Sequence, residues 1–190
     1  MKIFIGCSSS DNIDAAYIES CKDIIDSLMK NTNELLFGAM NEGIMGLSYK
    51  IAKGNNIKIT GIAPEYYKSD FKHLECDNEI ITAGVSERTE TLIKKADAVL
   101  FLPGGIGTMY EIFAAIEMKR SKEIDKPIII YNCLGFFDDF IIMLDKIYKE
   151  NFTRREVQSL YYVVTEVHEA VNYINNYFRN WKYYIYAGII

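Results

Sequence analysis

The sequence predicts an α/β fold in which helices cover both faces of a mainly parallel β-sheet, giving a three-layer α/β/α arrangement. Short apolar runs alternate with amphipathic helical patterns throughout the 190 residues. The runs are apolar at consecutive positions, as expected for strands buried on both faces of a parallel sheet. The length suits a single domain. We therefore expect residues 1–190 to form one domain that ends in an aromatic tail at about 178–190.

The first half of the chain contains four of the expected strands. The run KIFIG predicts a buried strand at 2–6. Segment 13–29 predicts a helix, because its apolar residues recur at spacings of three and four. The runs ELLFG, IKITGIA and EIITAG predict further strands. These strands lie at 34–38, 57–63 and 79–84, with a helix at 44–53 and a polar excursion through 73–78.

The second half repeats this alternation. Helices are expected at 87–95, 108–119, 136–150 and up to about 177, and strands at 97–103, 127–132 and 161–166. Ligands of parallel sheets bind beyond the carboxyl ends of the strands, where the loops lead into helices. The loops that follow the first, second and fifth strands are therefore the candidates for a binding site.

The charge balance argues against polyanionic partners. The net charge is −5, and Lys and Arg form almost no runs. Surfaces that bind nucleic acids or anionic membranes need a concentrated positive field. We therefore expect a small-molecule ligand, and neither a nucleic acid nor a membrane, as the partner.

The cysteines and histidines limit the possible chemistry. Cys7, Cys21, Cys76 and Cys133 are far apart and form no CxxC pair, which is typical of reduced thiols, although the sequence leaves a disulfide open. The 2 histidines give poor support for a multi-histidine zinc site or a Ser–His–Asp or Cys–His apparatus. The N-terminal apolar segment is too short for a signal peptide, and no run reaches the length of a membrane span. We expect a cytoplasmic protein without a metal site.

The first candidate loop is GCSSSDN at 6–12. The hydroxyl groups of Ser8 and Ser9, together with backbone amides, are suited to hold a phosphate where the first helix begins. A capped turn explains the same residues, and locally it is the better interpretation.

The second candidate loop is GAMNEGIMG at 38–46. Its glycines let the backbone approach a ligand, and Gly43 would open a helix whose positive end faces the site. Ala39, Met40 and Glu42 weaken this signal, because they crowd the loop and place a carboxylate near any phosphate.

The third candidate loop is LPGGIGTMYE at 102–111. Its three glycines allow positive φ and leave room for a ligand to touch the main chain. Thr108 and Glu111 match a capping box at a helix start, and locally this explains Glu111 better than catalysis does. The spacing is neither that of a dinucleotide-binding GxGxxG motif nor that of a Walker loop.

Arg88 lies in the first turn of the helix expected to begin near Ser86, which is a suitable N-cap. A cation in this position opposes the helix dipole. Two interpretations are equally supported locally, namely a solvated surface side chain and an anion-binding group at the ligand edge of the sheet.

The combined segment SERTETLIKKADAVLFLPGGIGTMYE resembles the signature of the Lonely Guy family of cytokinin riboside 5′-monophosphate phosphoribohydrolases, which are also labelled lysine decarboxylase-like. The family pattern is an Arg-containing helix start, a strand and then PGGxGTxxE, which is matched at every fixed position from Pro103 to Glu111. IFIGCSSS, GIMG, ITGIAP and the region after the motif extend the resemblance over most of the chain.

The resemblance implies a Rossmann-like nucleotide-binding domain that assembles as a homodimer or a larger homo-oligomer. It implies hydrolysis of the N-glycosidic bond of a nucleoside 5′-monophosphate, such as AMP or a cytokinin riboside monophosphate, to the free base and ribose 5-phosphate. Arg88 and Glu111 occupy the catalytic positions, and no cofactor or metal is needed. The substrate-binding residues would be Ser8, Ser9, Gly43, Thr89, Gly104, Gly105, Ile106, Gly107, Thr108, Met109 and Tyr110.

The implied roles suit the residue types. Cleavage at an anomeric carbon develops positive charge on the sugar, which a carboxylate such as Glu111 stabilises while it positions or activates water. A guanidinium such as Arg88 pairs with the phosphate or with the departing base.

The chain departs from the family pattern in two places. Gly38-Ala39-Met40 replaces a GGG run, with Glu42 before the next glycine, and Ser86 and Thr89 stand where the family has His and Lys. The alternatives are therefore a nucleotide-binding sensor that does not cleave its ligand, and an oligomeric scaffold that retains the glycine loop for folding.

Overall fold

The computed structural model describes the backbone of residues 1–186 and their side chains other than those of 70, 155 and 180–186. The final helix extends beyond the end expected near 177 and includes residues 178–186 of the predicted aromatic tail, whereas 187–190 lie outside the described residues.

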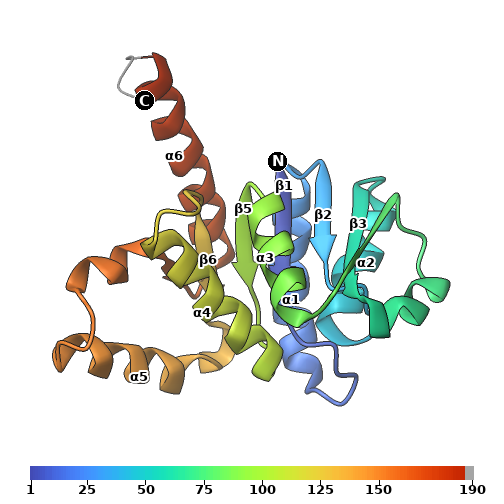
Figure 1. Ribbon diagram of the computed structural model, residues 1–190, viewed down its shortest axis with the longest axis horizontal. Coiled ribbons are helices and arrows are strands. Elements are labelled where there is room, and N and C mark those ends of the chain that lie inside the picture. Colours follow the sequence, from blue (N-terminus) through green and yellow to red (C-terminus); the bar gives the residue numbers. More distant parts are fainter. Residues whose placement is uncertain (187–190) are drawn as a thin grey trace.

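The described residues form a seven-stranded parallel sheet with the order β4-β3-β2-β1-β5-β6-β7 (Figure 1). Every pairing along this order is parallel, which confirms the predicted fold class. The strands are β1 (Lys2–Gly6), β2 (Glu34–Phe37), β3 (Lys58–Pro64), β4 (Asn78–Thr82), β5 (Ala98–Phe101), β6 (Ile128–Tyr131) and β7 (Tyr162–Val164).

Strand β1 is central, and the chain order reverses beside it. It pairs with β2 on one side, where Ile3 lies opposite Leu35, and with β5 on the other, where Ile3 lies opposite Ala98. Such a reversal creates a crevice at the carboxyl ends of the two central strands, where open α/β sheets bind ligands. The fold thus points to the loops after β1 and β5.

Helices cover both faces of the sheet (Figure 1). One hydrophobic cluster joins one face to α1, α2 and α6, and a second cluster joins the other face to α3, α4 and α5. The helices are α1 (Ala15–Met29), α2 (Gly43–Gly54), α3 (Val85–Lys95), α4 (Ile106–Arg120), α5 (Asp138–Lys149) and α6 (Val167–Tyr186), with short 3-10 segments η1 (Glu65–His73), η2 (Cys133–Gly135) and η3 (Arg155–Leu160).

The residues that cap the starts of α1 and α3 differ from those that the sequence suggests. Helix α1 begins after Asp14, whose Oδ1 accepts a hydrogen bond from the Ala16 N–H at 2.9 Å. Helix α3 is preceded by Gly84, so Ser86 lies inside the helix and the prediction that it is the N-cap is wrong. Glu87 instead accepts a hydrogen bond from the Ala83 N–H at 2.7 Å, reaching back from the first turn.

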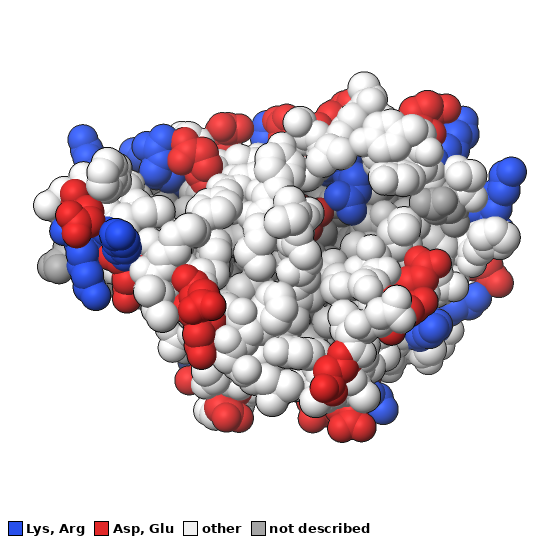
Figure 2. Space-filling view, turned by 90° about the horizontal axis from the view of Figure 1, so that it is seen from below, with Lys and Arg blue, Asp and Glu red and all other residues white. Residues whose placement is uncertain are grey.

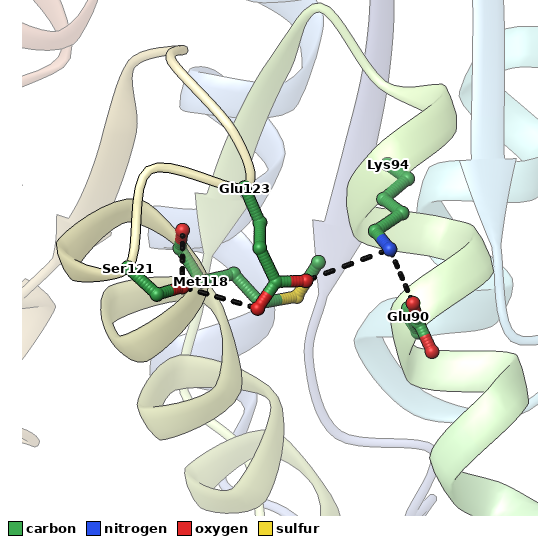
Figure 3. A network of polar contacts seen from close by, with 5 residues as sticks. All are labelled: Glu90, Lys94, Met118, Ser121 and Glu123. Carbon is green, nitrogen blue, oxygen red and sulfur yellow. Dashed lines mark hydrogen bonds and ion pairs between the residues drawn. The ribbon is translucent and has the colours of Figure 1, made fainter.

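Polar contacts join α3 to the segment that follows α4, at the ends of these helices far from the crevice. Lys94 binds Glu90 on its own helix and lies 3.5 Å from Glu123 after α4 (Figure 3). The Lys126 ammonium donates to the carbonyls of Ile93, Lys94 and Ala96 at the carboxyl end of α3. Cations at this end of a helix are favourable. These contacts join the carboxyl end of α3 to the segment between α4 and β6.

Candidate active site

Three loops meet at the carboxyl ends of the central strands. The Ser8 N–H, after β1, donates to the Pro103 carbonyl after β5 at 3.0 Å, and the Ser8 carbonyl accepts from the Met45 N–H in α2 at 3.0 Å. The loop after β1 is therefore hydrogen-bonded to both of its neighbours, and the three candidate loops form one site.

The centre of this site is an ion pair between Arg88 and Glu111. Nη1 of Arg88 lies 3.0 Å from Oε1 of Glu111, and Nε of Arg88 donates to the Ile62 carbonyl of β3 at 3.2 Å. The Arg88 and Glu111 side chains are only 15% and 6% exposed. A buried ion pair needs good geometry and further hydrogen bonds to offset the loss of hydration, and the Ile62 carbonyl supplies one of them.

Two glycines make room for this ion pair. A Cβ atom at Gly38, directly after β2, would lie 1.9 Å from Nη2 of Arg88. A Cβ atom at Gly6, the last residue of β1, would lie 2.8 Å from Oε2 of Glu111. Real Cβ atoms essentially never approach a neighbour this closely. The absence of side chains at these two positions therefore allows both charged groups to reach the crevice.

Burial changes the acidity of two groups in the site. It raises the pKa of the Glu111 carboxyl above its ordinary value, and the charge and hydrogen bond of Arg88 oppose this change. Burial also raises the pKa of the Cys7 thiol, with a further increase from the nearby Glu111 carboxylate. Cys7 therefore remains a neutral thiol near pH 7 and is a poor nucleophile.

The ion pair lies in the wall of a cavity of about 360 Å³. Figure 2 shows the end of the molecule where the strands finish: charged side chains lie mainly around the rim, and a hollow near the middle has a basic group beside an acidic one. The volume is in the range of small-ligand sites. The lining residues are Cys7, Ser8, Ser9, Ser10, Gly38, Met40, Met45, Pro64, Tyr67, Val85, Arg88, Gly105, Gly107, Thr108 and Glu111.

The amino end of α4 opens onto this cavity. The N-cap is Gly105, which has no side chain to cap the helix, and the first turn contains no acidic residue. The backbone N–H groups at such a helix start carry positive partial charge and bind anions. Thr108 lies inside the helix, and its Oγ1 occupies the position that a Cβ on Gly104 would approach at 2.1 Å. Thr108 and Glu111 therefore form no capping box, because Glu111 points to Arg88 instead.

The structure separates the predicted substrate-binding residues into two groups. Ser8, Ser9, Gly105, Gly107 and Thr108 line the cavity with Arg88 and Glu111. The others lie outside the lining: Gly104 faces a neighbouring cavity, Ile106 and Tyr110 are exposed on α4, Met109 packs against the core, Thr89 is buried, and Gly43 lies behind the loop after β1.

Two glycines of segment 38–46, Gly43 and Gly46, serve the scaffold. Gly43 has φ +58°, and its N–H donates to Oδ1 of Asp11 at 2.8 Å. A Cβ at Gly46 would lie 2.2 Å from the Asn41 carbonyl oxygen. The amino end of α2 is thus capped by a carboxylate of the chain itself, so the phosphate cradle suggested for this segment does not face an open helix end.

Several cavity residues carry no sequence signal of their own. Met40, Pro64, Tyr67 and Val85 form the outer, uncharged wall of the cavity. The sequence does not identify them as binding residues, because isolated apolar residues in loops resemble ordinary packing residues. Gly6 and Gly38 were equally ambiguous, since only the three-dimensional contacts identify what fills the space beside a glycine.

The described residues contain no group of three or more His, Cys, Asp and Glu side chains that is placed to hold a metal ion. Among the same residues, no helix is long and apolar enough to cross a membrane. All four cysteines are free thiols, and Cys7, Cys21 and Cys133 are buried.

Residues 38–174 match the profile of a protein family described as possible lysine decarboxylase. The chain belongs to this family. Among curated proteins, a probable cytokinin riboside 5′-monophosphate phosphoribohydrolase of Arabidopsis thaliana is 27% identical over 151 residues, covering 79% of this chain and 75% of the relative. The phosphoribohydrolase named LOG from Oryza sativa subsp. japonica is 24% identical over 177 residues, covering 93% and 73%. These relatives confirm the resemblance to the Lonely Guy family.

Solved structures of similar fold include proteins that are named for binding a cofactor and not as phosphoribohydrolases. The molybdenum cofactor carrier protein of Chlamydomonas reinhardtii superposes with a TM-score of 0.67 at 18% identity, covering 94% of this chain and 98% of that protein. The molybdenum cofactor binding protein of Rippkaea orientalis gives 0.66 at 16% identity, covering 92% and 95%. At this identity the likeness shows a shared Rossmann-type fold and no shared ligand.

Proposed function

We propose that the protein hydrolyses the N-glycosidic bond of a nucleoside 5′-monophosphate, giving a free base and ribose 5-phosphate. The observation that carries this proposal is the Arg88–Glu111 ion pair in the wall of a cavity of about 360 Å³, beside the open amino end of α4. The family relatives named as phosphoribohydrolases support the same reaction class. Four free thiols suit a reducing compartment, and we assign the activity to the cytoplasm.

The substrate phosphate binds at the amino end of α4. Gly105 and Gly107 present backbone N–H groups without side chains in the way, and a Cβ at either position would meet no atom within 4 Å. Ser8 and Ser9 add hydroxyl donors from the opposite loop. An anion in this position gains from the helix dipole and from several N–H groups at once.

The ribose then lies against Glu111, one turn further along α4. The C1′–N bond breaks as positive charge develops on the sugar, and the ionised carboxylate stabilises this charge and accepts a proton from the water that attacks C1′. The base leaves with the electron pair of the bond and takes up a proton. Arg88 favours the ionised form of Glu111 against the effect of burial and offers Nη2 to an anionic group of the substrate.

The base occupies the outer part of the cavity. Met40, Pro64, Tyr67 and Val85 provide apolar and aromatic surface there. A flat ring gains from stacking and from apolar burial in such a place. These residues carry no charged group that would select one base, so several nucleoside monophosphates are candidate substrates, including AMP and cytokinin riboside monophosphates.

A second candidate is binding of a nucleotide without cleavage. Ser86 and Thr89 replace the basic residues of the family pattern, and Thr89 is buried away from the cavity. The fold is shared with proteins named as cofactor carriers. This candidate predicts tight binding with no product.

The deciding experiment incubates the protein with a panel of nucleoside monophosphates and measures free base by mass spectrometry, comparing the wild type with Glu111→Gln. Base release that the variant abolishes supports hydrolysis. Binding detected by calorimetry with no release from any nucleotide supports the binding protein. If no nucleotide binds and no base is released, both candidates are refuted and a scaffold is favoured.

We also propose a homo-oligomer, with a second copy of the chain as partner. Ile106, Tyr110 and Phe113 recur at spacings of four and three along α4 and are exposed, Ile106 by 87%. A continuous exposed apolar stripe of this kind is typical of an interface, and the family resemblance implies at least a dimer.

A further inference from the structure

A second cavity of about 310 Å³ adjoins the active-site cavity. The two share Ser8 and Gly105, which line both. The second cavity has Tyr17 of α1 in one wall and Phe136, which follows η2 after β6, in another. It therefore lies on the β6 side of the crevice, whereas Gly38 and Pro64 place the active-site cavity on the β2 and β3 side.

The chemistry of the second cavity differs from that of the first. Ile13, Ile44 and Pro103 give it an apolar lining, and the rings of Tyr17 and Phe136 meet edge to face with centroids 5.7 Å apart. Among the described residues that line it, Asp14 is the charged one. Oδ1 of Asp14 accepts from the Ala16 N–H at 2.9 Å, so this carboxylate also caps α1. These features suit an aromatic ring that carries a hydrogen-bond donor or a positive charge.

The shared residues define how the two cavities connect. Gly105 is the N-cap of α4, so an anion bound at this helix start lies at the boundary between them. The boundary coincides with the reversal of strand order beside β1. Doubly wound sheets bind ligands made of two halves across such a reversal, with the linking phosphates at the helix start.

We propose that the protein binds a pyrophosphate-linked dinucleotide, with its nucleoside monophosphate half in the active-site cavity and its second ring in the Tyr17–Phe136 cavity. The proposal rests on the phosphate position given under the proposed function. It adds a ligand class, and it assigns Tyr17, Phe136 and Asp14 to the recognition of a ring that a mononucleotide lacks.

Three probes separate the contributions to binding. AMP tests the active-site cavity, ADP-ribose adds the second phosphate and a ribose, and NAD⁺ adds the nicotinamide ring. Calorimetry on the full chain is expected to give a dissociation constant for NAD⁺ at least about tenfold below that for ADP-ribose, a difference that a buried ring readily supplies. Phe136→Ala should remove this difference and leave AMP and ADP-ribose binding unchanged.

Phe152→Ala is the matched control, because Phe152 is 84% exposed and lines neither cavity. Equal affinities for NAD⁺ and ADP-ribose, with AMP still bound, would refute the dinucleotide proposal and leave the proposed function intact. Failure of AMP itself to bind would refute the phosphate position on which both depend. Sedimentation of Phe136→Ala tests whether a second copy of the chain occupies the cavity instead. Dissociation of an oligomer in this variant would show that a second copy fills the cavity and would overturn the proposal.

Discussion

Gly38→Ala is the sharpest test of the active-site geometry. The new Cβ would lie 1.9 Å from Nη2 of Arg88, whereas ordinary contacts begin near 3.4 Å. The guanidinium must therefore move by roughly 1.5 Å. It is planar and rigid, so Nη1 moves with Nη2 and the 3.0 Å contact with Glu111 is lost. Because a misplacement of about 1 Å can reduce a rate about a hundredfold, we expect at least that loss in base release, equivalent to ~2.7 kcal/mol of transition-state stabilisation.

The same substitution has a readout that is independent of the substrate. With the Arg88 guanidinium displaced and its hydrogen bond lost, the pKa of Glu111, already raised by burial, rises further. A carboxyl whose pKa is higher in the folded than in the unfolded state favours folding when protonated, and this contribution is lost as the pH rises from the unfolded to the folded pKa. Gly38→Ala should therefore lose more stability than the wild type as the pH rises above the ordinary titration range of a carboxyl, measured by thermal unfolding.

Gly54→Ala is the matched control, because a Cβ there meets no atom within 4 Å. Gly54 ends α2, and an alanine that fits its backbone is expected to be neutral or to stabilise the fold by a few tenths of a kcal/mol. Full activity in Gly38→Ala, together with a wild-type dependence of stability on pH, would show that Arg88 does not need the space beside Gly38. The reasoning about the glycine would then be wrong.

Three further predictions concern other parts of the molecule. Arg88→Met should move the acid limb of the pH–activity profile to higher pH, because it removes the charge that opposes the raised pKa of Glu111; an unmoved limb would mean that another group limits the reaction. Lys126→Met leaves three carbonyls at the end of α3 without their donor and should cost ~1–3 kcal/mol of stability by chemical denaturation, with Lys122→Met as the exposed control. Phe113→Glu should dissociate the proposed oligomer in sedimentation experiments, and a single unchanged species would count against the α4 interface.

The sequence predicts the sheet well because its strands are buried on both faces. Consecutive apolar residues in β1, β5 and β6 are a strong signal, and each expected strand is present with ends that differ by at most two residues. Helix starts were predicted less well. Ser86 is a preferred N-cap residue type, but it lies inside the helix, and Gly84 precedes the first turn. The reason is that Glu87, in the first turn, accepts the hydrogen bond of the Ala83 N–H just before the helix.

The candidate site could be predicted only in part, because its parts come from distant loops. Glu111 looked like a cap from its local spacing to Thr108, and the competing partner, Arg88, is 23 residues away. The resemblance to the Lonely Guy family selected the pair. No local pattern identifies Gly6 and Gly38 as spaces for these side chains, or Tyr67 as part of the cavity wall, since both facts depend on how β1, β2 and η1 are placed together.

The hydrogen bond between Asp11 and the Gly43 N–H has a consequence for the divergence of this chain from its relatives. With the end of α2 occupied by an internal carboxylate, this helix start is not needed to bind a phosphate, and segment 39–42 can accommodate residues such as Met40 and Glu42. Substitutions at position 11 and in this segment should therefore be epistatic.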